Sequence, residues 1–132
     1  MNGLHLIADL HGCRCAPDFL LNAPRLEAYA VDACRRHGLT VVGKLFHAFR
    51  DIDDHQSGVT GTVVLAESHL ALHTWPELGA VTLDVYVCNF SGDNSTLAEA
   101  LFEEMIGTFH PTEVERHRVQ RGRISANPTH PI

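Results

Sequence analysis

The segment from Ala66 to Gly79, AESHLALHTWPELG, alternates apolar and polar residues as a half-buried strand does, but its polar positions carry reactive groups. A serine hydroxyl can attack a carbonyl carbon, and a neutral imidazole can remove a proton near neutral pH. Packing alone requires none of these groups, so the segment is a candidate for catalysis. Eleven positions hold six of them: Glu67, Ser68, His69, His73, Trp75 and Glu77.

Two other interpretations of this segment stay open. A Ser/His hydrolase usually carries its nucleophile on a sharp turn between glycines, and AESHL has no glycine. A binding or regulatory protein of the same fold would need no reaction and would stay one intact chain. Taken singly, His73 is typical of a core histidine and Cys88 of a small buried hydrophobe.

Composition indicates one globular domain. The chain has 132 residues, 45% of them hydrophobic, and a net charge of −6 from 16 acids and 10 Lys and Arg. An acidic balance disfavours nucleic acid as a partner, because binding to phosphates needs surplus cations. No apolar run approaches the roughly 20 residues of a membrane span, and MNGLHLIADLHG does not resemble a signal peptide. These features predict a cytoplasmic protein without membrane or nucleic-acid partners.

The cysteines and histidines do not predict a metal site. Without signs of export, the four cysteines are expected to be free thiols. Cys13 and Cys15 lack the two-residue spacer of a zinc knuckle, and no second cysteine pair follows. The ten histidines are scattered along the chain, and no pair lies four residues apart on a predicted helix.

Hydrophobic periodicity and turn residues predict the elements that position the reactive segment. Strands are expected over 3–13, 39–49, 59–66, 80–88 and 112–122, helices over 22–38 and 93–109, a polar loop over 50–58 and a loose tail over 124–132. The chain around Ser68 is expected to be either one bent strand or a hairpin. Asn22 is expected to cap the first helix, and Asn94 or Ser95 the second.

This order predicts an α+β fold, a two-layer sandwich of one antiparallel sheet with both helices on one face. The other face of the sheet is then uncovered. On the strand over 80–88, valines and a leucine alternate with Asp84, Tyr86 and Cys88, which point to that uncovered face. Such a mixed face is expected to pack against a second copy or to line a site.

The segment ESHLALHTWPELG, with FHAF and GVTG before it and LDVYVC after it, closely resembles the small prokaryotic S-adenosylmethionine decarboxylases, pyruvoyl-dependent enzymes of polyamine synthesis. The resemblance extends from about His5 to Arg123. It implies one domain over 1–132 that cleaves itself between Glu67 and Ser68 into a β chain, 1–67, and an α chain, 68–132. Ser68 would become a covalent pyruvoyl cofactor that forms a Schiff base with the substrate amine, so no external cofactor is implied.

The same resemblance assigns roles to three further residues. His73 matches the base that removes the Cα proton of the serine during processing. Thr60 stands where the family commonly has serine, and its hydroxyl would stabilise the oxyanion of the acyl shift, with a methyl group that restricts its rotamers. Cys88 matches the general acid that returns a proton to the substrate carbon.

Substrate contacts and assembly also follow from the resemblance. Phe49 and the His73 ring match the pair that holds adenine between them, and Glu77 and the Trp75 backbone match the region around the ribose and methionyl groups. Glu67 would line the same pocket as the last residue of the β chain. A homodimer is implied, with sites at or near its interface.

The substrate has an alternative. Related enzymes decarboxylate L-ornithine or L-arginine with the same pyruvoyl chemistry, and acids near the pocket would suit a basic side chain. The loop after Phe49 carries Asp51, Asp53 and Asp54, and Leu78 stands where an aromatic residue is common. Because the adenine pair is retained, S-adenosylmethionine is the predicted substrate.

Overall fold

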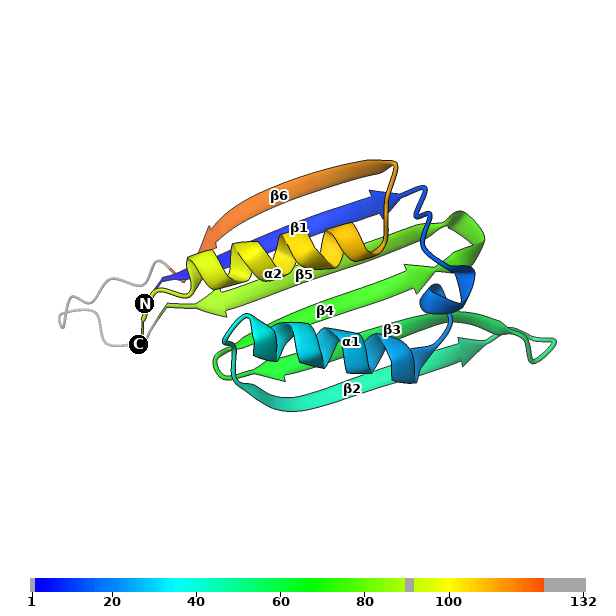
Figure 1. Ribbon diagram of the computed structural model, residues 1–132, viewed down its shortest axis with the longest axis horizontal. Helices are drawn as coiled ribbons and strands as arrows, with labels where there is room; N and C mark the ends of the chain where they lie inside the picture. The colour runs from blue at the N-terminus through cyan, green and yellow to red at the C-terminus, as the bar shows by residue number, and fades with distance from the viewer. Residues whose placement is uncertain (1, 90–91, 123–132) are drawn as a thin grey trace.

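Six antiparallel strands form a single sheet in the order β2-β3-β4-β5-β1-β6 (Figure 1). The computed structural model describes residues 2–89 and 92–122. The strands are β1 (Gly3–His11), β2 (Val41–Arg50), β3 (Gln56–Leu65), β4 (Ser68–Trp75), β5 (Ala80–Cys88) and β6 (Glu113–Arg121). Two short 3-10 turns, η1 (Pro17–Leu20) and η2 (Pro76–Leu78), lie in the connections.

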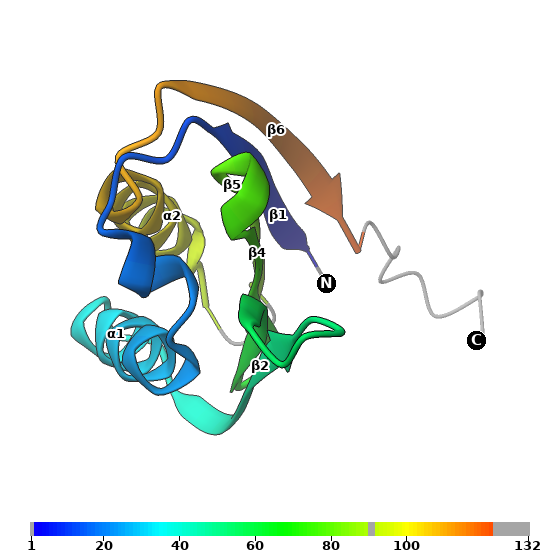
Figure 2. The ribbon, with the colours of Figure 1, turned by 90° about the vertical axis from the view of Figure 1, so that its right-hand side faces the viewer.

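The two helices cover one face of the sheet and leave the other open, as Figure 2 shows from the end of the molecule. Helix α1 (Ala23–Arg36) packs on β2 and β3, and α2 (Ser95–Thr108) packs on β5 and β1. The predicted α+β sandwich, with both helices on one face, is therefore confirmed. No helix within the described ranges is long and apolar enough to cross a membrane.

Alternation along the strands sorts side chains between the core and the open face. On β5, Val81, Leu83, Val85 and Val87 are buried under the helices, whereas Thr82, Asp84 and Tyr86 are half-buried on the open side. Cys88, at the end of the strand, is buried. The predicted mixed face therefore exists, and the central strands present polar groups on it.

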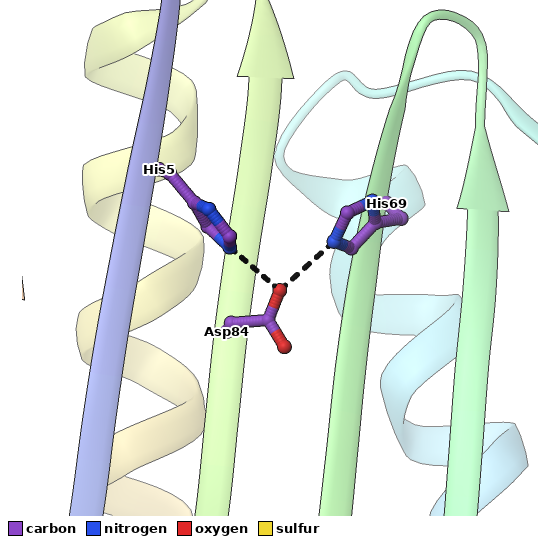
Figure 3. Close-up of side chains that lie close together, drawn as sticks. All are labelled: His5, His69 and Asp84. Atoms are coloured by element: carbon purple, nitrogen blue, oxygen red, sulfur yellow. Dashed lines mark hydrogen bonds and ion pairs between the residues drawn. The ribbon is translucent and has the colours of Figure 1, made fainter. Parts of the chain in front are cut away.

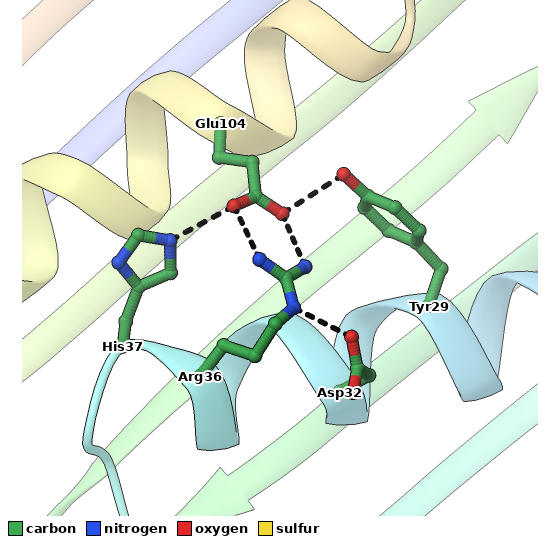
Figure 4. Close-up of polar contacts among 5 residues, drawn as sticks. All are labelled: Tyr29, Asp32, Arg36, His37 and Glu104. Carbon is green, nitrogen blue, oxygen red and sulfur yellow. Dashed lines mark hydrogen bonds and ion pairs between the residues drawn. The ribbon is translucent and has the colours of Figure 1, made fainter.

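A carboxylate on α2 ties the two helices together (Figure 4). Glu104 accepts hydrogen bonds from both terminal nitrogens of Arg36, at 2.8 and 2.6 Å, and from Tyr29 Oη at 2.9 Å. His37 Nε2 lies 3.0 Å from the same carboxylate. The guanidinium of Arg36, more than any other group, lowers the pKa of Glu104 to about 2. This ion pair fixes the end of α1, from which the chain continues to β2.

Local details refine the predicted elements. Asn22 caps α1 by accepting from the Arg25 N–H at 3.0 Å, as predicted. Asn94 occupies the cap position of α2 but donates to the Cys88 carbonyl instead, and the Asp93 carboxylate accepts from the Ser95 N–H.

The predicted loop over 50–58 is shorter in the structure, because Arg50 belongs to β2 and residues 56–58 belong to β3. The tail over 124–132 lies outside the described residues, and the four cysteines are free thiols.

Candidate active site

The chain around Ser68 is a hairpin rather than a bent strand. Leu65 pairs with Ser68, so Ala66 and Glu67 form a two-residue turn between β3 and β4. The Ala66 N–H donates to the Thr40 carbonyl at 3.0 Å, and Glu67 adopts a left-handed φ of 62°. A non-glycine residue in this region is strained by roughly 1 kcal/mol. The peptide bond between Glu67 and Ser68 thus follows a strained residue in a tight turn.

Ser68 lies beside Cys88 at this end of the sheet. The Cys88 N–H points toward Ser68 Oγ at 3.4 Å, and Asn94 Nδ2 donates to the Cys88 carbonyl at 3.3 Å. The backbone of Cys88 is therefore next to the candidate nucleophile, and the Cys88 residue is buried. A hollow of about 220 Å³ adjoins the turn and is lined by Gly38, Leu39, Thr40, Leu65, Ala66, Glu67, Ser68 and Asn94.

Thr60 and His73 form a second group, farther along the same hairpin. The two residues pair across β3 and β4, and Thr60 Oγ1 lies 2.7 Å from His73 Nδ1. His73 is exposed on the open face, with the Trp75 ring 6.1 Å away. This hydrogen bond orients the imidazole and leaves its Nε2 available to a ligand.

A second pocket, of about 340 Å³, surrounds this pair. It is lined by Phe49, Ser57, Gly58, Val59, Thr60, His73, Thr74, Trp75 and Glu77. The pocket therefore joins all the predicted substrate-binding residues except Glu67, which lies at the other end of the hairpin. Aromatic rings and one carboxylate make it suited to a flat, cationic ligand.

Four residues of the pocket lining were not among the predicted site residues: Ser57, Gly58, Val59 and Thr74. Gly58 has a φ of 149°, and a Cβ there would lie 2.6 Å from the Thr74 carbonyl, so only glycine fits. The buried Thr74 hydroxyl donates to the Leu20 carbonyl at 2.7 Å and accepts from the Val59 N–H at 2.8 Å. These contacts hold the pocket floor rigid. The glycine of GVTG was the available signal, whereas nothing local marks Thr74.

Ser68 and His73 do not meet within one chain. They lie five residues apart on the uninterrupted strand β4, which corresponds to about 17 Å at ~3.3 Å per residue. An odd spacing on a strand also directs the two side chains to opposite faces. The candidate residues therefore form two groups, one around Ser68 and Cys88 and one around Thr60 and His73.

The family model for S-adenosylmethionine decarboxylase matches residues 4–122, almost the whole described chain. The chain belongs to the S-adenosylmethionine decarboxylase family. Among its relatives are the S-adenosylmethionine decarboxylase proenzymes of Picrophilus torridus, 36% identical over 91% of this chain and 84% of the relative, and of Caldicellulosiruptor saccharolyticus, 37% identical over 91% and 88%. A crystal structure of the adenosylmethionine decarboxylase from Aquifex aeolicus superposes with a TM-score of 0.79, at 30% identity, covering 94% of this chain and 93% of that one.

Within this S-adenosylmethionine decarboxylase fold, the acidic residues of the loop after Phe49, which suggested a basic amino-acid substrate, contact other residues of the same loop and Arg50. Asp51 Oδ1 accepts from the N–H groups of Asp53 and His55, both at 2.9 Å, and Asp54 lies 3.7 Å from Arg50 Nε. The acids of the loop are exposed and do not line the pocket. Leu78 is 71% exposed and is also absent from the pocket lining. Neither departure supplies a site for the cation of ornithine or arginine.

Proposed function

We propose that this protein is a self-processing, pyruvoyl-dependent decarboxylase that converts S-adenosylmethionine to its decarboxylated form, the aminopropyl donor of spermidine synthesis. Membership of the family and the names of the relatives support the reaction. The relatives named above are proenzymes of this one activity, and none of their names mentions ornithine or arginine. The single observation that carries the proposal is a serine that directly follows a strained turn and whose hydroxyl lies 3.4 Å from the backbone N–H of the buried Cys88.

The turn suits cleavage of the chain at Glu67 and Ser68. The Ser68 hydroxyl would attack the Glu67 carbonyl carbon, its proton would pass to the departing nitrogen, and the peptide bond would become an ester. Removal of the Ser68 Cα proton would then expel the Glu67 carboxylate, and hydrolysis with loss of ammonia would leave the pyruvoyl group. The strain at Glu67 raises the energy of the intact peptide and so favours its conversion.

The residues around Ser68 fit a pyruvoyl group at the start of an α chain. That group supplies a ketone that takes up the electrons released with carbon dioxide. The adjoining hollow of about 220 Å³ leaves room for the reacting part of a substrate. The Cys88 thiol would hold and return a proton there, and two contacts support this role: the Cys88 N–H lies 3.4 Å from Ser68 Oγ, and Asn94 donates to the Cys88 carbonyl.

A complete site needs a second copy of the chain, because His73 lies about 17 Å from Ser68 on the same strand. A two-fold axis parallel to the sheet, crossing the strands near Ala71, would bring the Thr60–His73 pair of one copy to the end of the sheet at which β4 of the other copy begins with Ser68. The open face of the sheet provides the contact surface for such a homodimer. Two identical sites would then form, each built from both copies.

The Thr60–His73 pocket suits the rest of the substrate. Phe49, 47% exposed, and the His73 ring offer two faces for adenine, and Trp75 and Glu77 offer a ring and a carboxylate for the sulfonium and ribose. Glu67, at the end of the β chain, would approach this pocket only across the dimer interface. S-adenosylmethionine therefore accounts for both groups of residues.

Mixed dimers test the proposal. Ser68→Ala and His73→Ala chains, with different tags, are co-expressed and the mixed dimer is purified through both tags. We expect neither variant alone to be processed normally, but in the mixed dimer the His73→Ala chain should be cut at 67/68, because its partner supplies His73. Release of labelled carbon dioxide from S-adenosylmethionine, and not from ornithine or arginine, should accompany the cut.

Each alternative gives a different result. An uncut wild-type chain would refute self-processing and favour a binding or regulatory protein. If the wild-type chain is cut but the His73→Ala chain of the mixed dimer is not, the site shared between two copies is refuted. Turnover of ornithine or arginine alone would refute the substrate.

A further inference from the structure

His69, the residue after Ser68, is linked by its ring to two other strands through one carboxylate (Figure 3). His69 Nε2 lies 2.8 Å from Oδ2 of Asp84 on β5, and Nε2 of His5 on β1 lies 2.8 Å from the same oxygen. The His5, Asp84 and His69 side chains are 19%, 28% and 35% exposed. His5, Asp84 and His69 have no role in the reaction steps proposed above.

Arg121 determines which ring atoms carry the protons. Its Nη1 lies 3.2 Å from His5 Nδ1, and its guanidinium stands 4.7 Å over the Tyr86 ring. Because arginine only donates, His5 Nδ1 accepts, and the proton of a neutral His5 lies on Nε2 and is donated to Asp84. An ionised carboxylate only accepts, so His69 also donates through its Nε2.

This arrangement argues against a metal site, although the three potential ligand atoms lie within 4.8 Å of one another. A metal requires a lone pair on each nitrogen, and His5 Nε2 carries a proton. A histidine that binds a metal usually gives its other N–H to a carboxylate or carbonyl. Here a cation lies on that side of His5.

Cleavage would change what holds the start of β4. In the intact chain the turn at Ala66 and Glu67 ties Ser68 to β3. After the cut, residue 68 is a chain end, and chain ends fray unless they are tied down. His69 is then the second residue of the new chain, and its ring is bonded to β5, a central strand.

We propose that Asp84 and His5 are positioning residues that anchor the new chain end through His69 and keep residue 68 beside Cys88. The inference rests on the proposed function, because only cleavage creates this end. A hydrogen bond to an ionised carboxylate is about twice as strong as a neutral one, which suits a contact that must replace a covalent turn.

Two substitutions of one residue test the anchor. The side-chain amide of Gln places an N–H where His69 has Nε2, whereas Asn is one methylene shorter and does not reach Asp84. In the cut enzyme we expect amide hydrogen exchange over residues 69–72 to be roughly tenfold faster in His69→Asn than in wild type, and within about threefold in His69→Gln. In an uncut Ser68→Ala background, where the turn still holds β4, both variants should match their parent.

Asp84→Asn tests the same bond from the acceptor side, away from the peptide that breaks, and should speed exchange by a similar factor. Unchanged exchange in cut Asp84→Asn and His69→Asn would overturn the anchor and leave the proposed function standing. If neither Asp84→Asn nor His69→Asn is cut at 67/68, the anchor is also overturned, because an anchor for the new chain end acts only after cleavage. An uncut wild type would refute both proposals, and exchange in wild type that slows on addition of Zn²⁺ would assign the cluster to a metal.

Discussion

Replacing Glu104 with Gln removes the charge that ties the two helices together. Its carboxylate receives four hydrogen bonds, from Tyr29, from two nitrogens of Arg36 and from His37. A pKa lowered from its ordinary 4.5 to about 2 corresponds to roughly 3–4 kcal/mol, at about 1.4 kcal/mol per pH unit. Arg36 is 47% exposed, so solvent screening reduces the stabilisation to about 1–2 kcal/mol.

The sign of the pH dependence follows from the lowered pKa. A carboxyl group whose pKa is lower in the folded state stabilises the fold fully above its unfolded value, near 4.5 for Glu104. That contribution is lost as the pH falls from there toward about 2. Glu104→Gln should therefore be less stable than its parent by about 1–2 kcal/mol at neutral pH, and the difference should shrink near pH 3.

Urea unfolding measures both effects. The Ser68→Ala background is used because it is expected to keep the chain whole, and equal protein concentrations remove differences caused by dimerisation. The matched control is Glu103→Gln, one residue away, which breaks an exposed ion pair with Arg116 and should change the free energy of unfolding by less than about 1 kcal/mol. A Glu104→Gln protein as stable as this control at neutral pH, or a difference unchanged at low pH, would refute the reasoning.

Substitutions at four positions bear on self-processing. Ser68→Ala should stay one inactive chain by intact mass, because alanine cannot attack the preceding carbonyl; a cut at 67/68 would show that the site is wrong. His73→Ala should accumulate precursor or ester that hydroxylamine splits, and normal pyruvoyl formation would remove His73 from the mechanism. Thr60→Val should slow cleavage about a hundredfold while Thr60→Ser stays within a few fold, judged by gel time courses; equal rates would exclude the hydroxyl. Glu67→Gly should slow cleavage about fivefold by releasing roughly 1 kcal/mol of backbone strain, and an unchanged rate would mean that the strain is not used.

Periodicity was sufficient to predict the sheet, both helices and their shared face, because the central strands β1, β4 and β5 alternate buried and more exposed residues and α1 carries a capping Asn22. The β3–β4 turn could not be located from residue types. Ala66 and Glu67 are not turn formers, and Glu67 adopts its left-handed φ only because the strands on either side pair in register. The tertiary structure, not the local sequence, determines that conformation.

The candidate residues were named from the sequence, but their grouping was not foreseen. The odd spacing of Ser68 and His73 was visible and indicates opposite faces once β4 is known to be unbroken. The contact between His5 and Asp84 joins residues 79 positions apart, and no local pattern reports such a pair. Strand order brings them together, and it depends on the whole chain.

The strand order also determines what a cut between β3 and β4 would do to the molecule as a whole. Residues 1–67 supply β2, β3 and β1, and residues 68–132 supply β4, β5 and β6. In the order β2-β3-β4-β5-β1-β6, strand β1 lies between two strands of the other piece, so the pieces are interlaced along three seams. Separating the two pieces would break the backbone hydrogen bonds of three strand pairs, β3–β4, β5–β1 and β1–β6, so the cut enzyme would hold together without a covalent link. Once denatured, the pieces would have to find each other again, and renaturation would become a bimolecular, concentration-dependent process for a protein that first folded as one chain.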